Sequence, residues 1–189
     1  MQTNRYSERE RITRVAVLGL LIALSIVAGK YLAIRVGELF RLSLESTPIL
    51  LAGILFGPVA GAAVGVIADL VGCVLVGYAI NPLVTLGAAA IGALAGVLYA
   101  RLPLRRGVRL FLTVLGAHLV GSVLIKTFGL ATYYDTPFFV LLAWRALNYL
   151  VVGALDGAVV HLLLNVSAIA KYDVTATKAE EKNQSEERE

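Results

Sequence analysis

The sequence is poor in charge and in cysteine. Only 16% of its 189 residues are charged, whereas 58% are hydrophobic, and the mean hydropathy is +0.80. Such a chain has too little polar surface to coat a water-soluble globule of this length, so lipid must cover part of it. Cys73 is the single cysteine, which excludes an intrachain disulfide and a metal cluster built from thiols.

Several motifs that carry chemistry are missing as well. The sequence contains no Gly-x-x-x-x-Gly-Lys-Ser/Thr loop for ATP and no His-Glu-x-x-His zinc motif. His118 has no second histidine or carboxylate at ligand spacing, and we interpret it as a hydrogen-bonded packing residue. An enzyme that uses Ser122 and His118 as nucleophile and base is the weakest interpretation. We therefore predict no enzymatic activity, no cofactor and no metal site.

What the sequence does contain is a series of hydrophobic runs, most of them about 20 residues long, the length of a helix that crosses a bilayer. Four of the runs begin at a proline, which the first turn of a helix tolerates. The predicted helices cover roughly residues 12–34, 48–56, 58–76, 82–100, 108–129 and 137–167.

These helices predict an all-α integral membrane protein, a six-transmembrane-helix bundle over residues 12–170. Residues 1–11 form a polar N-terminal segment. Residues 171–189 are too polar to bury apolar surface, and we expect a disordered tail there.

The distribution of basic residues predicts the orientation. The segment 101–109 between the fourth and fifth helices contains four arginines and the N-terminal flank contains four more, whereas 78–81 and 131–136 contain no Lys or Arg. By the positive-inside rule, both termini and segment 101–109 are cytoplasmic in a multi-pass protein of a prokaryotic plasma membrane. No basic face is interleaved with aromatics, so we expect no nucleic-acid partner.

Small residues recur at one-turn spacing, as in helices whose backbones touch within a bilayer. The pairs Gly61 and Gly65, Gly92 and Gly96, and Gly153 and Gly157 predict packing inside the bundle. A further small-residue face lies on the first helix, and internal packing and docking of a partner helix are equally compatible with it. Its members are Ala16, Gly19 and Ala23.

Ionisable residues occur within the hydrophobic runs, where each costs roughly 3 kcal/mol or more and so calls for a partner or a purpose. At about 1.5 Å per residue, Lys30, Asp69 and Lys126 lie roughly 24, 16 and 27 Å from the cytoplasmic ends of their helices. Arg145 and Asn148 lie roughly 12 to 17 Å below the outer end of the last helix. These depths predict a polar pocket that opens outward. The alternative is an ion pair of Asp69 with Arg145 or Lys126 that merely orders the bundle, but the basic groups outnumber the acidic one.

One block of the sequence is similar to a known family. The block from Glu45 to Pro58, with its Glu-x-x-Pro-Ile start and Phe-Gly-Pro end, followed by Gly61, Gly65 and Asp69, resembles the substrate-binding S components of energy-coupling factor (ECF) vitamin transporters. The continuation over residues 69–82 is most similar to their folate-specific branch.

This resemblance implies partners and a transport role. S components capture a vitamin outside the cell, associate with a membrane coupling subunit (the T component) and two ATPase subunits, and are thought to topple in the bilayer. The family carries an Ala-x-x-x-Ala type face on the first helix for the coupling subunit. Gly19 and Ala23 match that face, which favours docking over internal packing.

The resemblance also implies a ligand. Asp69 would accept hydrogen bonds from the pterin edge of folate, and cationic side chains would neutralise its glutamate carboxylates. The loops around residues 35–47 and 78–81 would form a lid. The alternatives are an S component for another flat nutrient, such as riboflavin, thiamine or a queuosine precursor, and a solitary secondary transporter. The predicted ligand-binding residues are Asp69, Arg145, Asn148, Lys126, Lys30, Arg41, Glu45, Tyr78 and Asn81.

Overall fold

The computed structural model describes residues 2–36 and 40–166, so the predicted tail at 171–189 lies outside the described residues. Within this part of the chain, five helical segments are long and apolar enough to cross a membrane. Their helices are α1 (Gln2–Ile26) with the π-helical turn η1 (Val27–Tyr31), α3 (Pro58–Val76), α4 (Pro82–Arg101), the continuous run α5 (Arg106–Ala117), η2 (His118–Ile125, π-helical) and α6 (Lys126–Tyr134), and α7 (Phe138–Leu164).

All six predicted stretches are helical, but the second is short. Helix α2 (Ser46–Phe56) has 11 residues, about half of what a bilayer-crossing helix needs. It is nevertheless the most buried element, with ten of its residues buried. Helix α2 therefore forms part of the core of the bundle, and α3 follows it directly after Gly57, whose φ of 89° makes the sharp turn.

Two features differ from the sequence-based expectation. Helix α1 begins at Gln2 instead of near residue 12, although its membrane-compatible stretch starts at Arg11. The segment predicted as a plain outer loop contains an antiparallel hairpin of β1 (Ile34–Val36) and β2 (Phe40–Leu42). Both strands have an Arg between two apolar residues, an alternation too short to separate from loop in the sequence.

Glycines bring the backbones of α2, α3 and α4 into contact. A Cβ added to Gly61 or to Gly53 would overlap the carbonyl group of Gly92, and a Cβ on Gly65 would overlap Ala88. This confirms the predicted internal packing for the glycines of α3 and α4. Gly153 on α7 differs, because an added Cβ would lie 3.6 Å from the nearest atom, at ordinary contact distance.

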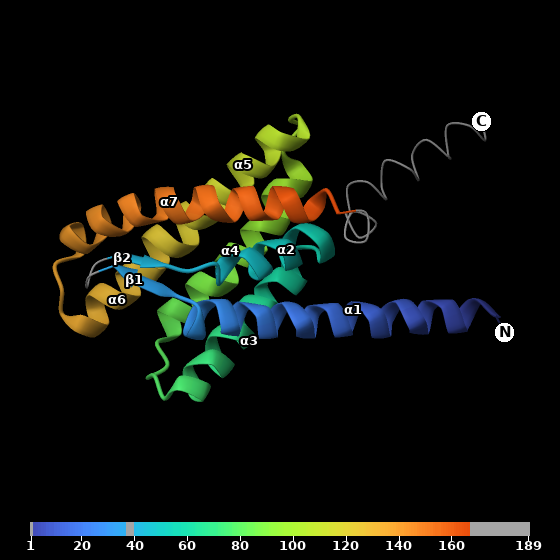
Figure 1. Ribbon diagram of the computed structural model, residues 1–189, viewed down its shortest axis with the longest axis horizontal. Coiled ribbons are helices and arrows are strands. Elements are labelled where there is room, and N and C mark those ends of the chain that lie inside the picture. Colours follow the sequence, from blue (N-terminus) through green and yellow to red (C-terminus); the bar gives the residue numbers. More distant parts are fainter. Residues whose placement is uncertain (1, 37–39, 167–189) are drawn as a thin grey trace.

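Figure 1 shows α1 and α7 lengthwise in the molecule, with α3 and α4 slanting across the view; the N-terminus and the end of α7 lie toward the same side. Two arginines join helix ends on this side. Arg106 Nη2 donates to Leu164 O at 2.8 Å, and Arg14 Nη2 donates to Phe56 O at 2.8 Å. The start of α5 thus lies beside the end of α7, because the two long helical runs between these points, α5 to α6 and α7, run in opposite directions. Which side of the membrane this is remains a prediction.

Candidate functional site

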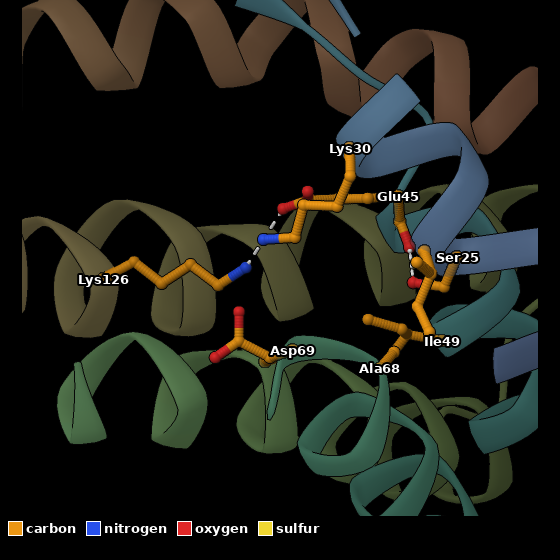
Figure 2. A pocket seen from close by; sticks show the side chains of 9 residues that line it. Ser25, Lys30, Glu45, Ile49, Ala68, Asp69 and Lys126 are labelled. Atoms are coloured by element: carbon orange, nitrogen blue, oxygen red, sulfur yellow. Dashed lines mark hydrogen bonds and ion pairs between the residues drawn. The ribbon is translucent and has the colours of Figure 1, made fainter. Parts of the chain in front are cut away.

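A small cavity lies where α1, α2, α3, α4 and α6 meet, and four charged side chains reach it from four segments of the chain (Figure 2). These are Lys30 from η1, Glu45 from the residue before α2, Asp69 from α3 and Lys126 from α6. The cavity measures about 20 Å³, room for about one water molecule. The other lining residues are Ser25, Ile26, Ile49, Ala68 and Ala88.

An ion pair crosses this cavity. Lys126 Nζ lies 3.4 Å from Glu45 Oε1, and the two side chains are 6% and 21% exposed. The backbone of Glu45 is fixed as well, because its carbonyl oxygen accepts a hydrogen bond from Ser25 Oγ at 2.7 Å. A charge this far from water needs an opposite charge beside it, and each member of the pair supplies one to the other.

Asp69 points into the cavity toward Lys126 (Figure 2). Its Oδ2 accepts a hydrogen bond from Thr85 Oγ1 at 2.7 Å. Its Oδ1 lies 4.0 Å from the thiol of Cys73, which in turn lies 3.8 Å from Lys30 Nζ. Tyr78 lies at the edge of this group, with its ring centroid 5.8 Å from Lys30 Nζ. Two carboxylates and two ammonium groups therefore line the cavity and can bind both donors and acceptors of a polar ligand.

Three glycines make room for three of the charged side chains. An added Cβ on Gly29 would lie 2.6 Å from Glu45 Oε2, one on Gly72 would lie 2.8 Å from Lys30 Cε, and one on Gly87 would lie 2.5 Å from Lys126 Cγ. This role of the glycines is not visible in the sequence. Each glycine lies on a different segment from the side chain that it admits, so no spacing in the sequence pairs them.

Both lysines of the site are associated with π-helical turns. Lys30 lies within η1, and Lys126 follows η2 directly. A π-helical turn changes the direction in which the following side chains point, and such turns are frequent at functional sites. The hydrophobic runs predict regular α-helices at both places, because apolar residues do not distinguish a π-helical turn from an α-helical one.

Arg145 and Asn148 do not line the cavity, although both were predicted as ligand contacts. Arg145 Nε donates to Thr127 Oγ1 at 2.9 Å and its Nη2 donates to Ser122 O at 3.0 Å. Asn148 is buried on the same helix. Without Arg145, the described cavity has two lysines and two carboxylates, so the predicted excess of basic groups is not found at its lining.

Of the four residues predicted for the lid, Glu45 and Tyr78 lie at the cavity as described above, and the other two have different surroundings. Asn81 caps the N-terminus of α4, because its Oδ1 accepts from Leu83 N at 3.0 Å, and its Nδ2 donates to Gly129 O on α6 at 2.8 Å. Asn81 therefore links the start of α4 to α6. Arg41 belongs to β2, and its side chain lies outside the described residues.

A second polar cluster lies in the core, away from the cavity. His118 Nε2 lies 2.9 Å from Asp156 Oδ2, His118 Nδ1 lies 3.1 Å from Ser122 Oγ, and Thr47 Oγ1 donates to Asp156 Oδ1. Asp156 and Ser122 have no exposed surface and His118 has 2%. His118 is therefore the hydrogen-bonded packing residue that was predicted, and Ser122 is one of its partners.

The small-residue face of α1 is on the outside of the molecule. Ala16, Gly19 and Ala23 are all exposed, and a Cβ added to Gly19 would meet nothing within 4 Å. This settles the open question of internal packing, because no described element of the chain covers the face.

Comparisons with known proteins agree with this architecture. A crystal structure of FolT bound with folic acid has a TM-score of 0.66 and 24% identity, over 79% of this chain and 90% of that one. A structure of the S component of a bacterial ECF transporter has a TM-score of 0.62 and 19% identity, over 82% of this chain and 97% of that one. At these identities the likeness establishes a shared fold.

The sequence comparisons are more specific. A search of curated proteins finds no match. The family described as ECF-type riboflavin transporter, S component, matches residues 9–171, which is most of the chain. Because a match of this extent includes every membrane-spanning helix and the whole cavity, the protein belongs to the family of ECF-type riboflavin transporter S components.

Proposed function

We propose that this S component captures folate from outside the cell in the cavity formed by Lys30, Glu45, Asp69 and Lys126. As a member of its family the chain is a vitamin-binding, multi-pass subunit of a plasma-membrane transporter and not an enzyme. The observation that carries the choice of ligand is that two ammonium groups and two carboxylates meet at one cavity within an apolar bundle. Folate combines a donor-rich pterin edge with two carboxylates, so it can satisfy both kinds of charge.

Each group has a distinct role in this proposal. Asp69, held by Thr85, accepts from the 2-amino and ring N–H donors of the pterin. Lys126 and Lys30 neutralise a glutamate carboxylate of the ligand. The cavity is too small for the vitamin as it stands, so the Glu45 and Lys126 side chains must separate, and the ligand carboxylate then replaces Glu45 beside Lys126.

Riboflavin is the second candidate, and two observations favour it. The first is that the family that matches the chain is described by riboflavin, and the second is that the cavity lining has no excess of lysines over carboxylates, so no ligand carboxylate is needed to balance it. A ligand without carboxylates would leave the Glu45 and Lys126 ion pair in place. Asp69 would then accept from the ring N–H of the flavin.

Isothermal titration of the purified protein against folic acid, riboflavin and thiamine tests the proposal. Folic acid is expected to bind, and Asp69→Asn is expected to weaken it by at least about tenfold, because an amide accepts on one side only. Asp135→Asn, in the loop before α7, is the matched control and should bind as the unmodified protein does. Binding of riboflavin alone would replace folate by the second candidate, and equal affinity of Asp69→Asn for folic acid would overturn the site.

We further propose that Ala16, Gly19 and Ala23 dock on the membrane coupling subunit. Their exposure on α1 supports this, since a helix can approach closely only where side chains are small. Two partner ATPases supply the energy, and the S component topples within the bilayer to release the vitamin inward.

A further inference from the structure

The guanidinium of Arg145 forms hydrogen bonds with other groups of the protein. Its Nε and Nη2 each donate a hydrogen bond, to Thr127 Oγ1 and to Ser122 O, and its Cζ lies 5.2 Å from the ring centroid of Tyr149. An arginine that bonds two acceptors through its planar fork fixes those acceptors relative to each other. The positions of these two acceptors therefore indicate what Arg145 does.

The two acceptors flank Lys126. Ser122 lies in η2, four residues before Lys126, and Thr127 follows it directly. Lys126 is the first residue after the π-helical turn, where the hydrogen-bond pattern of the helix returns to α. Any change in the length of η2 would rotate the Lys126 side chain out of the cavity, so a clamp across this point determines whether Lys126 faces the ligand.

Helix α7 also holds the other end of η2. His118, the first residue of η2, lies 2.9 Å from Asp156 of α7, and the same carboxylate accepts from Thr47, two residues after Glu45. Polar contacts from one helix thus secure the start of η2, its end, and the start of α2. Glu45 and Lys126, the two members of the cavity ion pair, each lie within two residues of such a contact.

From this geometry we infer that Arg145 is a positioning residue, which holds the end of η2 so that the Lys126 ammonium faces the cavity, and that it does not touch the ligand. The part of this inference that concerns affinity rests on the proposed function. The part that concerns the Glu45 and Lys126 ion pair does not depend on any ligand.

The first experiment is a double-mutant cycle on affinity in purified protein, with folic acid as probe, or riboflavin if the vitamin panel selects it. Arg145→Ala should weaken binding by about tenfold, and Lys126→Met should do so as well. In the Lys126→Met background, Arg145→Ala should cause no further loss. Equal losses in both backgrounds would show that Arg145 acts independently of Lys126 and would overturn the inference.

Two further variants separate positioning from general stability. Thr127→Val removes one acceptor of Arg145 at nearly constant volume and should weaken binding by a smaller factor, with no further loss in the Lys126→Met background. Arg145→Lys should not restore affinity, since a single ammonium cannot reproduce the fork. Tyr149→Phe, which removes only a contact of 3.5 Å, is the control and should bind normally. Full affinity in Arg145→Lys would contradict the proposed geometry.

The second experiment needs no vitamin. The thermal midpoints of Glu45→Gln, Lys126→Met and the double variant are measured with Arg145 and then with Ala at position 145. With Arg145 present, the losses of the two single variants should not add, because they break one ion pair. In the Arg145→Ala series, the losses in thermal midpoint of the two single variants should add. Coupling of the same size in both series would overturn the inference even if the identity of the vitamin proved different.

Discussion

At the residue scale, the most consequential contacts are those between a charged side chain and a glycine. Gly87 lies against Lys126 Cγ and against the carbonyl oxygen of Gly121, at 2.5 and 2.7 Å from an added Cβ. One contact is with a flexible side chain, the other with backbone that cannot move alone. Gly87 thus serves both the packing of α4 on η2 and the path of Lys126 to the cavity.

Gly87→Ala should therefore reduce stability and ligand affinity together. Overpacking of this kind costs typically about 1 to 3 kcal/mol. The control is Gly107→Ala near the start of α5, where an added Cβ meets nothing within 4 Å. Thermal melting and titration of the two variants check the expectation, and equal behaviour of both would mean that α4 and η2 separate readily.

Asp156 offers a second prediction at this scale. Its carboxylate, with no exposed surface, is bonded to both His118 and Thr47. Asp156→Ala leaves two buried groups without that acceptor and should destabilise the protein by roughly 1 to 3 kcal/mol for each. Asp156→Asn keeps one acceptor oxygen and should reduce the stability of the protein by less than Asp156→Ala. Denaturation in detergent measures both, and a larger loss for Asn than for Ala would contradict this account of the cluster.

At the scale of whole helices, α1 and α3 use small residues for opposite purposes. Gly61 of α3 lies against the backbone of α4, whereas Gly19 of α1 faces outward. The spacing of small residues predicted internal packing for Gly61 but left both uses open for Gly19, and only the family resemblance favoured docking there. The difference arises only when the neighbouring helices are in place.

The same substitution at these two glycines should therefore have different effects. Gly19→Leu should leave folding and vitamin affinity unchanged but prevent co-purification with the coupling subunit and ATPases, since the leucine blocks close approach of a helix. Gly61→Leu should prevent folding. Expression, titration and co-purification of both variants check this. Intact assembly of Gly19→Leu would remove α1 as the docking face.

At the scale of the whole molecule, the charge distribution predicts an orientation. The contact of Arg106 with Leu164 places the basic segment 101–109 beside the end of α7. If this side is cytoplasmic, a periplasmic reporter enzyme fused after Arg105 should be inactive, and one fused after Thr136 should be active. The opposite pattern would invert the predicted topology, and the cavity would then open inward.

Much of the fold could be predicted from the sequence, because membrane helices are specified locally. A run of apolar residues must satisfy its own backbone hydrogen bonds in lipid, so the prolines and hydrophobic lengths located all six helical stretches. The hairpin and the two π-helical turns could not be predicted in this way, because each depends on contacts with other segments. Ser43, for example, donates to Ala28 O at 3.2 Å and so ties the segment after β2 to η1.

The site was predicted only in part, and the limit has the same physical cause. The sequence by itself determined which charges interrupt apolar runs. Lys30, Asp69 and Lys126 were predicted this way and Glu45 by family resemblance; all four line the cavity, and their contact with a ligand stays a prediction. The tertiary structure decided which charges meet. It paired Lys126 with Glu45 across 81 residues and turned Arg145 toward η2, because the direction of a side chain depends on helix rotation and on the glycines of neighbouring helices.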